Sequence, residues 1–145
     1  MKLMNKYPEC FPENFEMEIL PKEAKKENKP VYRIIKYGTI NRESFISTYE
    51  EIIRGLIPPK RKMNWNDPGT YSTSCNIEYS EAEYALNMFM RHHPKAFIAK
   101  GETEKTCGPC QLTSEREAKE GTHVDWWIYE DSEPQTYFKE VNDNE

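Results

Sequence analysis

Val31-Tyr32-Arg33-Ile34-Ile35-Lys36-Tyr37 is the stretch of sequence that decides the fold. It is rich in β-branched and aromatic residues and ends at Gly38, which is typical of a β-strand. Apolar residues then recur with a period of 3.6 between Asn41 and Gly55, which predicts an amphipathic helix with Asn41 as its N-cap. A strand followed directly by a helix indicates a domain that combines both kinds of element.

The rest of the chain extends this pattern in both directions. The apolar spacing predicts further strands at 15–20, 70–75, 96–99 and 124–129, and further helices at 80–93, at 113–119 and from Pro134. The sequence therefore predicts one compact α+β domain over 1–145, with a mostly antiparallel sheet, two main helices and a short C-terminal helix. Outside these elements we expect an irregular lead-in at 1–12, a long polar loop at 101–122 and an acidic tail at 142–145.

Composition narrows the class of partner. The 145 residues carry a formal net charge of −5, and 37% of them are hydrophobic and 12% aromatic, which argues against a disordered chain. No apolar run is long enough for a membrane span and no secretory signal is visible, so we expect a soluble, cytoplasmic protein. No concentrated basic face is present, so duplex nucleic acid is an improbable partner. A protein or a small-molecule ligand is expected, and the sequence leaves the oligomeric state open.

The stretch His123-Val124-Asp125-Trp126-Trp127-Ile128-Tyr129-Glu130-Asp131 is the densest group of unusual residues in the chain. A strand would place His123, Asp125, Trp127 and Tyr129 on one face, where a carboxylate, an imidazole and two aromatic rings could bind a ligand. The leading hypothesis is a small binding or regulatory domain that acts through an aromatic and acidic surface at 123–131. The alternative is a central strand that is buried on both faces, whose polar residues satisfy backbone groups.

Two cysteines near the end of the chain admit three interpretations. The tetrapeptide Cys107-Gly108-Pro109-Cys110 resembles the active site of thioredoxins, which implies a thiol made acidic at the start of a helix. The same two thiolates could form half of a zinc site. The remaining zinc ligands would then come from Cys10, Cys75, His92, His93 or His123. In the third interpretation Gly-Pro forms a tight turn between two ordinary thiols.

A third pattern is spread over the whole chain. Arg33 lies on one predicted strand, Ser72-Thr73-Ser74 on another, and Glu130 follows the Trp pair. This order is similar to that of ADP-ribosyltransferases of the Arg, Ser-Thr-Ser, Glu class. The resemblance implies that Arg33 binds the phosphates of NAD, that Ser72 and Ser74 brace the cleft, and that Glu130 stabilises an oxocarbenium-like transition state. The family's closing motif, Glu or Gln, one spacer and Glu, is missing, because Ile128 stands two positions before Glu130.

Overall fold

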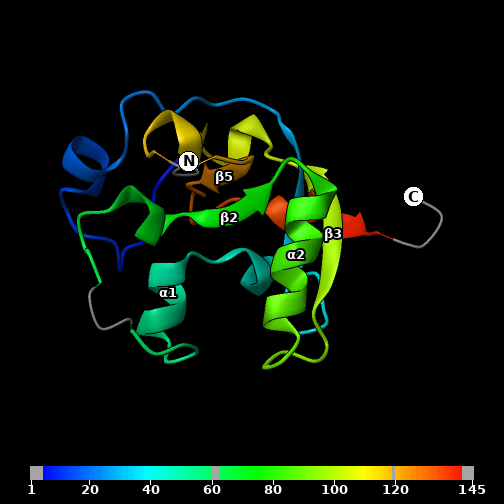
Figure 1. Ribbon diagram of the computed structural model, residues 1–145. Helices are drawn as coiled ribbons and strands as arrows, with labels where there is room; N and C mark the ends of the chain where they lie inside the picture. Colours follow the sequence, from blue (N-terminus) through cyan, green and yellow to red (C-terminus); the bar gives the residue numbers. More distant parts are fainter. Residues whose placement is uncertain (1–4, 60–62, 119, 142–145) are drawn as a thin grey trace.

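A computed structural model describes residues 5–59, 63–118 and 120–141. These residues form one compact α+β domain around a six-stranded sheet with the strand order β4-β5-β2-β1-β3-β6 (Figure 1). Every neighbouring pair of strands is antiparallel. The α+β class and the antiparallel sheet predicted from the sequence are therefore confirmed. In the part of the chain that the structure describes, no helix is both long and apolar enough to cross a bilayer.

The strand predicted at 31–37 lies inside the sheet, between two neighbours. Its bounds and those of the other main elements are β1 Pro30–Ile35, α1 Thr48–Ile53, β2 Thr73–Asn76, α2 Tyr79–Phe89, β3 Phe97–Glu102, β4 Cys110–Leu112, β5 His123–Trp126 and β6 Lys139–Glu140. α2 packs on β1, β2 and β3. The other face of the sheet covers the larger hydrophobic cluster.

Alternation along the strands separates an apolar side from a polar side. Val31 and Ile35 of β1 belong to the larger cluster, together with Cys75, Val124 and Trp126. Successive side chains of a strand point to opposite faces, so the intervening residues of β2 and β5 project from the other face. That second face carries Ser74 and Asn76 of β2 and His123 and Asp125 of β5, and the candidate site is built there.

The stretch 15–20 is not a strand, although its apolar and acidic residues alternate. Phe15–Ile19 forms a single π-helical turn, in which the Leu20 N–H donates to the Phe15 carbonyl. Phe15 and Ile19 are buried in the smaller cluster, whereas Met17 is 82% exposed. The prediction was wrong because the period-2 pattern places Met17 with its apolar neighbours, and only the first and last of the three are buried.

The helix predicted from Asn41 to Gly55 is divided into two pieces. Arg42–Phe45 is a 3₁₀ helix, which Asn41 caps as predicted, and α1 begins only at Thr48. Between them the backbone of Ile46 and Ser47 is extended, and Ser47 caps α1 by accepting from the Glu50 N–H. Phe45 and Ile46, which stand at the division, are both buried.

The segment 101–122, predicted as a long polar loop, contains regular structure. It holds the end of β3, the strand β4 and the 3₁₀ helices Lys105–Cys107 and Thr113–Glu115. The predicted helix at 113–119 is this second 3₁₀ helix, and Lys119 lies outside the described residues. The short C-terminal helix is the 3₁₀ helix Pro134–Tyr137, while the predicted acidic tail at 142–145 falls outside the described residues.

Candidate functional site

Three neighbouring strands place polar side chains on one face of the sheet. The register pairs Ser74 of β2 with Asp125 of β5, and Gln111 of β4 with Asp125 on the other side. Directly paired residues project from the same face, so these three side chains lie in one row across the sheet. The polar residues at alternate positions of β2 and β5 thus gather around Asp125.

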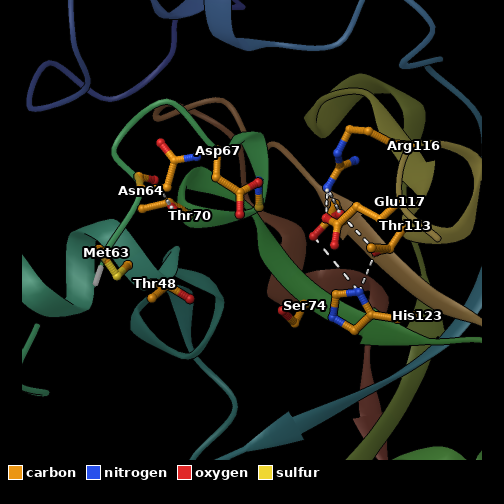
Figure 2. Close-up of a pocket in the computed structure, with 12 residues that line it drawn as sticks. Thr48, Met63, Asn64, Asp67, Thr70, Ser74, Thr113, Arg116, Glu117 and His123 are labelled. Atoms are coloured by element: carbon orange, nitrogen blue, oxygen red, sulfur yellow. Dashed lines mark hydrogen bonds and ion pairs between the residues drawn. The ribbon is translucent and has the colours of Figure 1, made fainter. Parts of the chain in front are cut away.

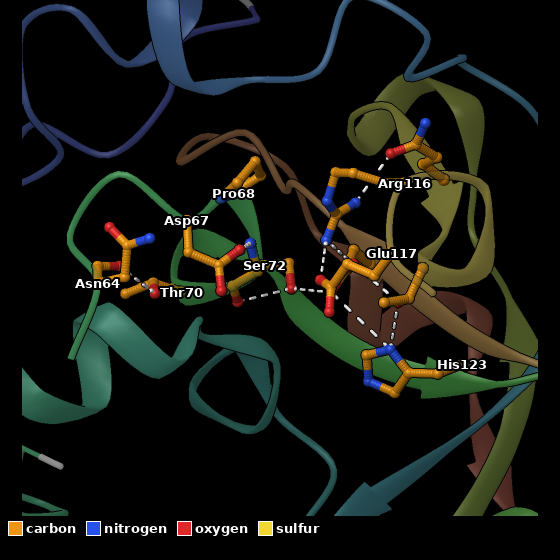
Figure 3. A network of polar contacts seen from close by, with 12 residues as sticks. Asn64, Asp67, Pro68, Thr70, Ser72, Arg116, Glu117 and His123 are labelled. Carbon is orange, nitrogen blue, oxygen red and sulfur yellow. Dashed lines mark hydrogen bonds and ion pairs between the residues drawn. The ribbon is translucent and has the colours of Figure 1, made fainter. Parts of the chain in front are cut away.

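Asp125 is the centre of this group and is only 2% exposed. Its Oδ1 accepts a hydrogen bond of 2.6 Å from the Ser72 hydroxyl. Its Oδ2 accepts from the Thr113 hydroxyl at 2.8 Å and from Arg116 Nη2 at 2.7 Å. Figure 3 shows Ser72, Arg116 and His123 arranged around this network. Buried charges persist when they are paired and hydrogen-bonded, and all these partners stabilise the ionised carboxylate.

Two opposing effects set the pKa of Asp125. Burial alone would raise it, because a low-dielectric environment disfavours the charged form. The hydrogen bonds from Ser72 and Arg116, the nearby His123 and the hydrogen bond from Thr113 act in the opposite direction and outweigh burial. The pKa of Asp125 is therefore held below its usual value, and the carboxylate is ionised at neutral pH.

His123 is connected to Asp125 through Thr113. The Thr113 Oγ1 atom lies 2.6 Å from His123 Nδ1, and its single proton is donated to Asp125. The hydrogen bond between Thr113 and His123 must then be donated by the imidazole, which assigns the proton to Nδ1. The hydrogen bond with Thr113 orients the imidazole ring on its protein side. The side chain of His123 is 39% exposed, so the ring also reaches solvent.

These residues line a cavity of about 400 Å³, which we call the Asp125 pocket. Figure 2 shows Thr113, Arg116, Glu117 and His123 along one side of it, with Ser74 between the two sides. The opposite side is made by Thr48 at the start of α1, by Met63 and Asn64, and by the turn that contains Asp67, Gly69 and Thr70. The pocket thus draws on α1, on two loops and on two strands of the sheet.

The lining of the Asp125 pocket has an excess of negative charge. Asp67, Glu117 and Asp125 contribute carboxylates, and Arg116 is the permanent cation among the lining residues that the structure describes. Arg116 donates to Asp125 and contacts Glu117 at 3.3 Å, so its charge is already shared between two carboxylates. Such a lining favours neutral or cationic ligands over anions.

The predicted aromatic surface at 123–131 does not exist, because its aromatic residues are in the core. Trp126 and Trp127 are both 0% exposed and Tyr129 is 5% exposed. The indole N–H groups donate to the carbonyls of Gly108 and Pro68, which satisfies them internally. Of the four predicted ligand-binding residues, only His123 and Asp125 line the pocket.

The four residues of the ADP-ribosyltransferase pattern are only partly brought together. Ser72 and Ser74 lie on the pocket face, and with Arg33 they line a second cavity of about 220 Å³. Three N–H groups of Arg33 are directed at the backbone carbonyls of Ser44 and Ser74, which fastens β1 to β2 and to the 3₁₀ helix Arg42–Phe45. Glu130 is exposed, lines neither cavity, and follows the end of β5.

Cys107 and Cys110 are buried thiols with different surroundings. They connect a 3₁₀ helix to β4, so neither stands at the start of an α-helix as the resemblance to thioredoxins implies. Burial is the main cause that raises the pKa of both thiols, whereas an attacking thiol needs a lowered pKa. Within the described ranges no three His, Cys, Asp or Glu residues are arranged to hold a metal, and two thiols do not make the four-ligand site that structural zinc requires.

Arg116, Thr113 and Asp67 are among the pocket residues that the sequence did not indicate. Arg116 stands in the Ser-Glu-Arg-Glu stretch of the helix predicted at 113–119, and nothing in its spacing links it to Asp125. Asp67 could have been found, because Asp67-Pro68-Gly69 is a turn signal and its carboxylate caps the 3₁₀ helix Pro68–Tyr71.

Comparison with protein-family models, with curated proteins and with solved structures finds no match to this chain. No residue can therefore be given a role by similarity. Residue roles follow only from the geometry of the Asp125 pocket and of the cavity beside it.

Proposed function

We propose that the protein binds a small polar ligand without net negative charge in the Asp125 pocket. The observation that carries this proposal is the buried, ionised carboxylate of Asp125 in the wall of a cavity of about 400 Å³. Cavities of this size are typical of small-molecule sites, and a few convergent polar groups give such sites their specificity.

The side chains of the pocket support a hydroxylated or amine-bearing ligand. Asp67 and Glu117 offer carboxylate acceptors, and the hydroxyls of Thr48 and Ser74 make no hydrogen bond with the part of the chain that the structure describes. Polar groups at the wall of a cavity that have no protein partner are available to a ligand. The excess of carboxylates would oppose a phosphate or a carboxylate on that ligand.

Ligand-observed NMR with three classes of probe tests the proposal. The probes are neutral methyl glycosides, the cation agmatine and the anion ribose 5-phosphate. We expect saturation transfer to the neutral or cationic probes and little to the anion, because of the acidic lining. Preference for the anion, or binding of none of the probes, would contradict the proposal.

A blocking variant shows whether binding takes place in the Asp125 pocket. A Cβ atom added at Gly69 would lie 3.5 Å from Asp67 Oδ1 and 3.8 Å from Asp125 Oδ1, so a larger side chain extends into the pocket without a clash at Cβ. Gly69→Leu is expected to abolish binding. Ser114→Leu, at an exposed position of the neighbouring turn, is the matched control and is expected to bind as wild type.

The second candidate is an NAD-consuming transferase. It is favoured by one observation: Arg33, Ser72 and Ser74, the first three residues of the pattern, line one cavity. In this alternative Asp125 stands beside the serines in place of the expected Glu130, since Asp125 is paired with Ser74 and accepts from Ser72.

Release of nicotinamide from NAD distinguishes the two candidates. If the protein is a transferase or an NAD hydrolase, nicotinamide accumulates with wild type and its rate falls at least tenfold in Ser74→Ala. If NAD is recovered unchanged after prolonged incubation, with and without an acceptor protein extract, the transferase candidate is rejected and the ligand-binding proposal is unaffected.

A further inference from the structure

The second cavity adjoins the Asp125 pocket, and the two share three lining residues. Thr48, Ser74 and His123 line both cavities, so the side chains of these residues form the boundary between them. Figure 2 shows Ser74 and His123 next to each other at this boundary. A ligand that fills the Asp125 pocket at this end therefore meets the opening of the second cavity.

The second cavity differs from the first in chemistry. Its walls include the apolar side chains of Ile34, Ile46, Ala85 and Phe89. The charged groups on its wall include Lys36 and Glu51, which pair with each other at 2.9 Å, and Lys36 Nζ also lies 4.9 Å from the centre of the Phe89 ring. Arg33, the other permanent cation on this wall, donates to the backbone carbonyls of Ser44 and Ser74. These three charges are satisfied within the protein, so the four apolar side chains offer the surface that suits an apolar group.

The size of the second cavity limits that group. Its volume is about 220 Å³. Apolar cavities of roughly 150 Å³ hold one benzene molecule. A single aromatic or heteroaromatic ring therefore fits, whereas the larger Asp125 pocket has room for a sugar ring and the hydroxyl-binding groups that suit it.

We propose that the ligand is a glycoside of an aromatic ring, with its uncharged sugar in the Asp125 pocket and its ring in the second cavity. This inference rests on the proposed function and specifies its ligand. The bond between sugar and ring lies beside His123, Ser74 and Thr48. Aryl glycosides and nucleosides share this chemistry, and separate probes distinguish them.

Isothermal titration calorimetry with matched probes tests the inference. The probes are 4-nitrophenyl glucoside and galactoside, the corresponding methyl glycosides, and adenosine as the nucleoside. Burial of one aromatic ring is expected to lower the Kd by about tenfold or more relative to the methyl glycoside. Tighter binding of adenosine than of the nitrophenyl glycosides would identify the ligand as a nucleoside. Tighter binding of the nitrophenyl glycosides would identify it as an aryl glycoside.

Two variants on α2 show where the ring binds. Ala85→Leu fills the second cavity and does not touch the Asp125 pocket, so it should remove the advantage of the aryl over the methyl glycoside and leave methyl glycoside binding unchanged. Asn87→Leu places the same side chain at an exposed position of the same helix and should retain the full advantage. Circular dichroism and the Tm of each variant verify that it is folded.

The outcomes separate this inference from the proposed function. Equal affinities for aryl and methyl glycosides, or an aryl advantage that survives Ala85→Leu, would overturn the assignment of the second cavity and leave the Asp125 pocket as a binding site. Glycoside binding that persists in Gly69→Leu would overturn the proposed function itself. Binding of agmatine alone would reject the glycoside and support a cationic ligand in the Asp125 pocket.

Discussion

Asp125 shows how single hydrogen bonds decide the state of a buried residue. Its carboxylate is ionised because Ser72, Thr113 and Arg116 donate to it. A carboxylate whose pKa is lower in the folded than in the unfolded state stabilises the protein above the unfolded pKa of about 3.9. That stabilisation is lost as the pH falls through the lower, folded value.

Ser72→Ala should destabilise the protein more at pH 7 than at pH 3. The substitution removes one donor from Asp125, so the pKa of Asp125 rises towards its unfolded value and the loss at pH 7 should be about 1–3 kcal/mol. As the pH falls through the lowered pKa of Asp125 in the folded protein, the carboxylate loses the charge that the Ser72 hydroxyl stabilises, so the difference in stability from wild type narrows. Urea unfolding of both proteins at pH 7 and pH 3 measures this difference in the free energy of unfolding.

Ser74→Ala is the matched control for this prediction. Ser74 lies in β2, two residues after Ser72, and its hydroxyl has no hydrogen bond within the described part of the chain. Its removal should change the free energy of unfolding by less than about 0.5 kcal/mol at either pH. A pH-independent loss in Ser72→Ala would mean that the hydrogen bond does not depend on the charge of Asp125.

At the scale of elements, the divided helix is the clearest difference between expectation and structure. The periodicity of 45–56 is that of one helix, and within such a helix Ser47 would be a polar-face residue. In the structure Ser47 is buried and caps α1, and the Glu50 side chain in turn accepts from the Ser47 N–H. Ser47 and Glu50 have the spacing of a capping box, the local signal that marks the break.

Ser47→Ala therefore gives opposite results for the two arrangements. In the observed structure it removes an N-cap and should reduce the free energy of unfolding by about 1 kcal/mol. Inside one continuous helix the same change would increase stability, because alanine has the higher helix propensity. Chemical denaturation measures the sign, with Ser114→Ala at an exposed position of a 3₁₀ helix as control. A gain in stability would contradict the divided helix.

At the scale of the molecule, the four cysteines report on how the chain is folded. Cys10 is exposed, whereas Cys75, Cys107 and Cys110 are buried in the larger hydrophobic cluster. Burial raises the pKa of Cys75 to about 12, so very little of this thiol is ionised at neutral pH. Burial also keeps thiol reagents away from it. Gly108 keeps this region tight, since a Cβ there would lie 1.9 Å from the Trp127 carbonyl oxygen.

Thiol labelling of the native protein should accordingly occur in two phases. One thiol, Cys10, should react fast, and the other three should react roughly a thousandfold more slowly, because they are reached only through unfolding. Labelling with a disulfide reagent, followed by mass spectrometry of peptides, measures this, and Cys10→Ser is the control that removes the fast phase. Fast labelling of Cys107 or Cys110 would revive a thiol-based function.

The sequence by itself determined the parts of this protein that depend on local pattern. The central strand, predicted at 31–37 and observed at Pro30–Ile35, follows from local pattern. The Asn41 cap, the α+β class and the concentration of unusual residues at 123–131 follow in the same way, from periodicity and turn chemistry that act over a few residues. His123 and Asp125 were found in this way, because alternation places them on one face of a strand.

Only the tertiary structure decided which residues meet. The hydrogen-bond donors to Asp125 are Ser72, which is 53 residues away in the sequence, and Thr113 and Arg116, which lie in another turn. No local sequence pattern encodes those contacts. It also decided that Trp126 and Trp127 are core residues, since burial depends on what covers a strand. Contacts between residues that are distant in the sequence set the charge of a buried carboxylate and the shape of a pocket. For this reason the site could be recognised only in the tertiary structure.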